Sequence, residues 1–174
     1  CAAGRVSFEG APNCTACPIG TYSDGAGRAR TLATTCEVCI EGRFAKPEAS
    51  ECEDCPAGFF SAAGRANCTA CPVGTGSSRR FGKLPETNCT VCEAGTISGL
   101  HASACTACSA GRRSSAMASK CRVCPRGRYS LARSSSCGVC EAGTMSNNGS
   151  SACASCAPGR ISLAGATNCT DCVA

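Results

Sequence analysis

Cysteine is the residue type in this chain whose spacing most clearly implies chemistry. The 174 residues include 21 cysteines, and twenty of them form Cys-x-x-Cys pairs, from Cys14-Cys17 to Cys169-Cys172. Such a pair can be a redox-active dithiol, half of a four-thiolate zinc site, or part of a disulfide framework. A redox pair needs an activated thiolate between a strand and a helix, and this sequence offers no such context. The redox interpretation is therefore rejected.

Zinc remains an alternative, because pairs separated by a dozen or more residues match four-thiolate ligation. The even spacing, however, does not say which two pairs would face each other. Disulfides allow two patterns: bridges within each repeat, or bridges that interlock neighbouring pairs. We favour the local pattern, because it survives two length insertions without changing partners. Its bridges are Cys1 to Cys14, Cys17 to Cys36, Cys39 to Cys52, Cys55 to Cys68, Cys71 to Cys89, Cys92 to Cys105, Cys108 to Cys121, Cys124 to Cys137, Cys140 to Cys153 and Cys156 to Cys169.

The cysteine pairs mark a tandem repeat. Counted from the second cysteine of each pair, a glycine follows at the third position and an apolar residue at the fifth, except at Gly76 and Arg113. The sixth residue is serine, except at Ala45. A fixed period must be read before any secondary structure is assigned. We expect one continuous array over residues 1–174, a window of a longer chain, with repeats 1 to 10 at about 1–16, 17–38, 39–54, 55–70, 71–91, 92–107, 108–123, 124–139, 140–155 and 156–171.

Two repeats are longer than the rest. Repeat 2 has extra residues within Asp24–Thr35 and repeat 5 within Ser77–Thr87. Insertions in repeat proteins lie in exposed loops and often on the binding face, although surface loops also lengthen at little entropic cost. The candidate binding residues in these two loops are Arg28, Arg30, Arg79, Arg80 and Phe81.

Composition excludes an ordinary hydrophobic core. Leu, Ile, Val and Phe together number 21, and tryptophan is absent. This is well below the roughly 20% expected of a chain that folds by apolar burial. We therefore predict a small disulfide-rich fold: an elongated array of repeats of about sixteen residues with short β-hairpins and loops, and little or no helix. Local bridges should make each repeat autonomous, and the recurring glycine indicates either a positive φ or close approach of a neighbouring strand.

The phrase Cys-Pro-x-Gly-x-aromatic-Ser, followed by a glycine-containing turn and Asn-Cys-Thr-x-Cys, is complete in Cys55–Cys71. It resembles the ephrin-receptor-like cysteine-rich repeat and the first submodule of tumour-necrosis-factor receptor repeats. The resemblance extends over all 174 residues and implies the local bridge pattern. It also implies an extracellular matrix, receptor, or protist or algal surface protein. Proline follows the second cysteine in four repeats only, so this part of the pattern is incomplete.

Sugars are the one modification that the sequence predicts, and no cofactor is expected. Five Asn-x-Ser/Thr sequons occur, four of them immediately before the first cysteine of a pair, a position where asparagine can also serve a turn. The candidate glycosylation sites are Asn13, Asn67, Asn88, Asn148 and Asn168.

Positive charge gathers in one stretch. The chain carries a net charge of +5, and no acid lies between Glu93 and Glu141. This distribution suggests an acidic polysaccharide or protein partner, or else a solvated surface. Nucleic acid is not expected, because few aromatic residues are available to stack bases. The basic residues of the stretch are Arg112, Arg113, Lys120, Arg122, Arg126, Arg128 and Arg133.

We expect an extracellular or cell-surface structural or adhesive glycoprotein that forms a disulfide-stapled rod or fibre and is not an enzyme. It would associate with itself or with neighbouring surface or matrix proteins, and with membrane only through parts outside this window. The alternatives are a ligand-binding receptor ectodomain stalk and, more remotely, a zinc-binding array of four-cysteine sites. The lone His101 cannot complete a histidine metal site and is expected to be a loop residue.

Overall fold

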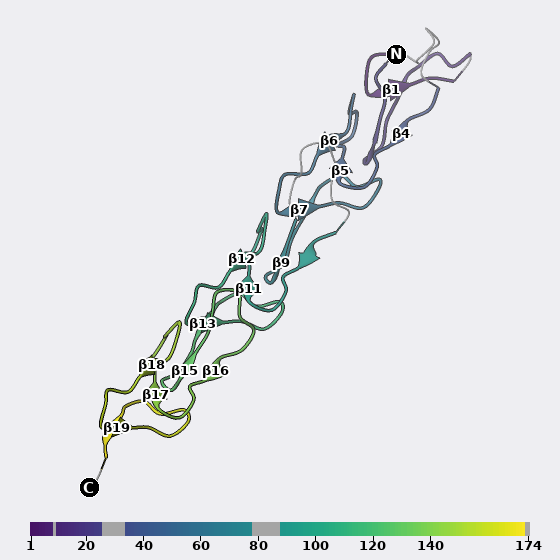
Figure 1. Cartoon of the computed structure of the whole chain (residues 1–174). Helices are drawn as coiled ribbons and strands as arrows, with labels where there is room; N and C mark the ends of the chain where they lie inside the picture. Colours follow the sequence, from purple (N-terminus) through teal and green to yellow (C-terminus); the bar gives the residue numbers. More distant parts are fainter. Residues whose placement is uncertain (9, 26–33, 78–87, 173–174) are drawn as a thin grey trace. The chain divides into compact units, whose positions relative to one another are not determined.

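A computed structural model describes residues 1–8, 10–25, 34–77 and 88–172 (Figure 1). Over these residues it contains short antiparallel strand pairs and no helix, which confirms the predicted fold class. The chain divides into two compact units. The first comprises Cys1–Cys71 and Ser77–Thr90, and the second comprises Pro72–Gly76 and Val91–Ala174.

Hairpins of two-residue strands build the first unit. Each strand pairs with the next along the chain. The pairs are β1 (Arg5–Val6) with β2 (Thr15–Ala16), β3 (Thr21–Tyr22) with β4 (Glu37–Val38), β5 (Arg43–Phe44) with β6 (Glu53–Asp54), and β7 (Phe59–Phe60) with β8 (Thr69–Ala70).

The second unit repeats the same hairpin (Figure 1). Strand β9 (Thr75–Gly76) belongs to this unit, and β10 (Thr90–Val91) lies where the sequence passes from one unit to the other. The remaining pairs are β11 (Thr96–Ile97) with β12 (Thr106–Ala107), β13 (Arg112–Arg113) with β14 (Arg122–Val123), β15 (Arg128–Tyr129) with β16 (Gly138–Val139), β17 (Thr144–Met145) with β18 (Ala154–Ser155), and β19 (Arg160–Ile161) with β20 (Thr170–Asp171).

A tight turn places the first strand of each hairpin. In repeat 7 the N–H of Arg112 donates to the carbonyl of Ser109 at 3.2 Å, and Gly111 has φ +78°. A positive φ at the third residue of a four-residue turn defines type II geometry, which favours glycine. We call this residue, which lies three positions after the cysteine that begins each repeat, the turn glycine. Its carbonyl then accepts from the N–H of Cys124 at 2.9 Å, so the hairpin closes on the next cysteine pair.

Sulfur and small polar groups fill the interior of both units. Most of the cysteines that begin repeats are buried, as are most serines at the sixth position of a repeat. Among the described residues, the other buried apolar side chains are Val6, Ala45 and Cys169. Stability therefore depends on bridges and backbone hydrogen bonds more than on apolar burial.

A ladder of hydrogen bonds joins each repeat to the next. The N–H of Gly111 donates to the carbonyl of Ser130 in repeat 8 at 2.7 Å, and the hydroxyl of Ser130 donates back to the carbonyl of Arg112 at 3.0 Å. We call this sixth residue the ladder serine. In repeat 3 Ala45 keeps the backbone bond, from the N–H of Gly20 to its carbonyl at 2.8 Å, but has no hydroxyl to donate. The prediction that each repeat is autonomous is therefore wrong: the bridges are local, but the polar backbone groups are shared between repeats.

Contacts also reach the second repeat along the chain. A Cβ added to Gly111 would clash with the carbonyl oxygen of Gly149, which lies two repeats further on. The same holds for Gly95 and Arg133, whereas a Cβ on Gly143 in repeat 9 would meet nothing within 4 Å. Both properties expected of the turn glycine, a positive φ and a close neighbour, are thus combined at Gly111.

Where a residue two repeats further on approaches a turn glycine, that residue has a left-handed backbone of its own. It lies nine positions after the cysteine that begins its repeat, and we call it the left-handed position. Its φ lies between +57° and +80° in every described case. Glycine occupies it in some repeats and a side chain in others, among them His101, which is exposed. Its members are Gly10, Glu48, Gly64, His101, Met117, Arg133, Gly149 and Gly165.

Candidate functional site

Twenty cysteines form ten disulfides in the local arrangement that the sequence favoured. Every bridge joins the second cysteine of one pair to the first cysteine of the next, with Cα atoms 5.5 to 5.8 Å apart. Cys172 is a free, exposed thiol. A bridged sulfur is not a thiolate, so the paired cysteines do not offer zinc the ligands of a four-thiolate site. Within the described ranges no group of three or more potential metal ligands occurs.

All five sequon asparagines are exposed. In four of them the cysteine of the sequon is bridged, and the following threonine begins the second strand of a hairpin, as Thr170 does in β20. Asn148 differs, because it lies in the turn region of repeat 9 beside Gly149. Glycosylation of these five asparagines remains a prediction.

The candidate binding loops lie outside the residues that the structure describes. Arg28 and Arg30 fall within 26–33, and Arg79, Arg80 and Phe81 fall within 78–87. Their role as binding residues stays a prediction.

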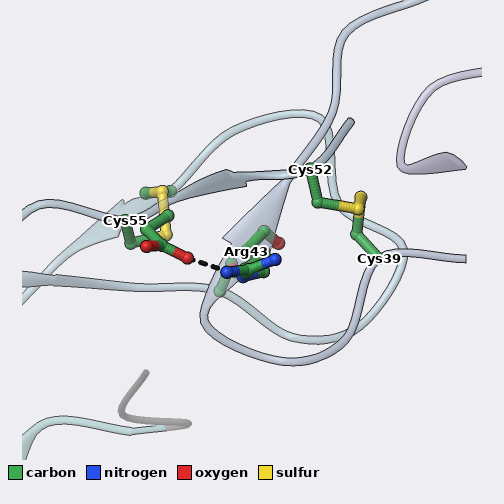
Figure 2. A network of polar contacts seen from close by, with 7 residues as sticks. Cys39, Arg43, Cys52 and Cys55 are labelled. Carbon is green, nitrogen blue, oxygen red and sulfur yellow. Dashed lines mark hydrogen bonds and ion pairs between the residues drawn. A yellow bond between two sulfur atoms is a disulfide. The ribbon is translucent and has the colours of Figure 1, made fainter. Parts of the chain in front are cut away.

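Several arginines on the first strands pair with acids. Arg43 Nε lies 2.6 Å from Asp54 Oδ1, its partner across the hairpin, close to the Cys39–Cys52 bridge (Figure 2). The corresponding atoms of Arg160 and Asp171 are 2.7 Å apart. The Arg160–Asp171 pair is largely exposed, so it contributes at most about 1 kcal/mol to stability. The Arg43–Asp54 pair is half-buried. Their arrangement shows that the hairpin register can match an arginine with a carboxylate.

The seven basic residues between Glu93 and Glu141 follow a different pattern. Arg113 is half-buried and the other six are exposed. No ion pair to any of these seven is present within the part of the chain that the structure describes. Arg128 Nη1 donates to the carbonyl of Cys137 at 3.2 Å, and Arg113 and Arg122 face each other across β13 and β14. The sequence revealed the charge run but not this facing pair, because the pairing depends on the hairpin register.

Two tyrosines at the fifth position of their repeats contact the second strand of their own hairpin. Tyr22 donates its hydroxyl to Glu37 Oε2 at 2.7 Å, across β3 and β4. The Tyr129 ring lies over Gly138, its cross-strand partner, where an added Cβ would come within 3.0 Å of Cε1. Their backbones meanwhile form bridges to the next repeat, Tyr22 to Ala49 and Tyr129 to Ser150. Neighbouring repeats are therefore joined here by backbone.

Residues 42–81 match the family model described as tyrosine-protein kinase ephrin type A/B receptor-like. This segment is therefore similar to the cysteine-rich repeats of that receptor family. It covers repeat 4, the most regular copy of the phrase, and the other repeats share its bridge, turn glycine and hairpin.

No curated protein matches the sequence. The ephrin-receptor-like match and the disulfides together imply an extracellular or surface location and a receptor-like or structural role. Across the described residues, no helix has the length and apolar character needed to span a bilayer.

Proposed function

We propose that this chain is a structural or adhesive glycoprotein of the extracellular space or cell surface, in which the repeats form a rod or fibre. The observation that carries the proposal is the ladder, in which the turn glycine of one repeat donates to the ladder serine of the next. A repeat that is oriented by its neighbours transmits rigidity along the chain, so the number of repeats becomes a functional quantity. We assign no reaction to the chain, since repeats of this family are typically non-enzymatic extracellular modules.

The surface of the repeats supports an adhesive role. The large side chains of Leu131 and Leu163 are 67% and 83% exposed, and the sequon asparagines are exposed as well. In the proposed assembly these side chains would be buried against another surface, and glycans would keep other faces solvated. The partners we propose are further copies of this chain, neighbouring matrix or surface proteins, and acidic polysaccharides.

Small-angle X-ray scattering of the oxidised chain tests the rod directly. A compact domain of 174 residues has a radius of gyration of about 16 Å, and an unfolded chain of that length about 44 Å. A rod gives an intermediate value, together with a cross-section that stays constant along its length. Reduction of the disulfides should raise the radius towards the unfolded value. A native radius near 16 Å would exclude the rod.

A receptor ectodomain stalk is the second candidate, because the matching family model is receptor-like. In this proposal the loop at Arg79, Arg80 and Phe81 binds a protein ligand. The test replaces all three residues with alanine and compares binding of the parent and variant chains to intact cells. Unchanged binding would count against the stalk, while the scattering result would stand on its own.

A further inference from the structure

Two arginines face each other at the centre of the basic stretch. The register of β13 and β14 places Arg113 opposite Arg122. In the preceding repeat the same pair is Ile97 and Thr106. Like charges directly opposite each other destabilise a strand pair. A bound anion between the two guanidinium groups would remove that repulsion.

Both arginines line a hollow of about 630 Å³, and Lys120 is part of its wall. Ser115 and Ser119 add exposed hydroxyl groups to the lining. This volume lies within the range of about 300 to 1,000 Å³ that small-ligand sites occupy. Guanidinium, ammonium and hydroxyl groups all donate hydrogen bonds, and arginine matches the planar geometry of oxyanions. The hollow in repeat 7 therefore has the donors of an anion site and no carboxylate in its wall.

Other hollows of the second unit lack this character. One is lined by Arg160, whose charge is already paired with Asp171 at 2.7 Å. Another is lined by Glu141 and has no basic residue. Among these three hollows, the one in repeat 7 alone combines several cations with no compensating acid.

We propose that the hollow of repeat 7 binds the sulfate or carboxylate groups of an acidic polysaccharide. The proposal deepens the function above and rests on it, because such polymers are met outside the cell. Exposed cations continue into repeat 8 at Arg126, Arg128 and Arg133, which suits a polymer longer than one sugar. The hollow lacks the aromatic anchors that dominate protein interfaces, so an acidic sugar fits it better than a peptide.

The substitutions for the test are copied from the same positions of neighbouring repeats. Arg113→Ile with Arg122→Thr copies the Ile97 and Thr106 pair of repeat 6, so it preserves the hairpin. The control, Arg126→Ala with Arg128→Thr, copies residues found at the same positions of repeat 9. Each variant removes two positive charges. Hydrogen exchange of the unliganded proteins verifies that both are folded, and the hollow variant should be at least as stable as the parent.

Binding is measured at 0.15 M salt, where charges beyond about 8 Å are screened. The probes are dextran sulfate, polygalacturonate, neutral dextran and polyglutamate. We expect the parent to bind a sulfated or carboxylated polysaccharide and not neutral dextran, and the two acidic polymers tell the sulfate from the carboxylate. The hollow variant should lose more than about tenfold in affinity, as expected when charge-assisted hydrogen bonds are removed, and the control about two- to threefold.

Three results would overturn the site. Equal losses in the two variants would mean diffuse attraction to a basic surface. Polyglutamate binding as tight as polysaccharide binding would indicate that the ligand of the hollow is an acidic protein. No binding to either acidic polysaccharide would remove the ligand altogether, and a rod-like scattering profile would then still support the structural role.

Discussion

In the 174-residue chain, alanine at Gly111 should be far more damaging than alanine at Gly143. The two turn glycines have nearly the same backbone, with φ +78° and +81°, and both donate to the ladder serine of the next repeat. They differ in what lies beside them. A Cβ on Gly111 would clash with the carbonyl oxygen of Gly149, whereas a Cβ on Gly143 would meet nothing within 4 Å. The pair therefore separates backbone strain from close approach.

The free-energy cost of each substitution can be worked from these contacts. A left-handed alanine costs about 1 to 2 kcal/mol, partly offset because alanine restricts the unfolded chain by about 0.4 to 1 kcal/mol. Gly143→Ala should therefore cost about 1 kcal/mol. Gly111→Ala adds overpacking of about 1 to 3 kcal/mol and weakens the bond from the Gly149 N–H to the Cys124 carbonyl, now 2.9 Å, by about 1 kcal/mol. The difference between the two variants should exceed about 2 kcal/mol.

Amide hydrogen exchange on the oxidised, 174-residue chain measures this difference locally. The disulfides keep either variant from unfolding fully, so the relevant quantity is the opening free energy of single amides. Protection of the Gly149 amide should fall about 30-fold more in Gly111→Ala than in Gly143→Ala, since every 1.4 kcal/mol is tenfold. Equal losses of protection would refute the contact between a repeat and the second repeat along.

Three further changes test the ladder, the left-handed position and the bridges. Ser114→Ala removes a buried 3.0 Å hydrogen bond to the preceding repeat and should lower local opening free energies by about 1 kcal/mol. Ala45→Ser should raise the opening free energies around it by about 0.5 kcal/mol. Unchanged exchange rates would show that the hydroxyl group contributes nothing to stability. Arg133→Gly should stabilise repeat 8 by about 0.5 to 1 kcal/mol in the same assay, because φ is +61° there, and Arg133→Ala should not; equal effects would assign any gain to the lost charge. Replacing Cys124 and Cys137 by serine should cost about 3 kcal/mol, seen as lost protection in repeat 8 and its neighbours but not in repeat 2, and protection lost along the whole chain would contradict local stapling.

The sequence predicted the hairpins and the bridge pattern because both follow from spacing. The glycine at the third position, the serine at the sixth and the cysteine pairs recur in register, and each has a local structural role. Repetition also identified Arg113 as an exception to the apolar fifth position. In these features the chemistry of one repeat is enough to predict the fold.

Other features depend on neighbouring repeats and left little trace in residue type. The left-handed position is occupied by a glycine or by residues as different as Glu48, His101, Met117 and Arg133. Residue type is not decisive there because backbone hydrogen bonds fix the conformation, as when the N–H of Glu48 donates to the carbonyl of Cys17 at 3.0 Å. The second strand of each hairpin lies in the two residues between paired cysteines, too short for a periodic pattern. The hollow at Arg113 and Arg122 could not be predicted either, because it depends on the register of β13 and β14.

The central claim, that each repeat is closed by its own disulfide, is tested most directly by mapping bridged peptides. The oxidised, 174-residue chain would be alkylated without reduction, with and without a chelator, and then digested and analysed by mass spectrometry, with glycans removed enzymatically. The account predicts alkylation at Cys172 only, and linked peptides that join each second cysteine to the next first cysteine, such as Cys108 with Cys121. Linkage of Cys105 to Cys121, or thiols that react only after chelation, would contradict it.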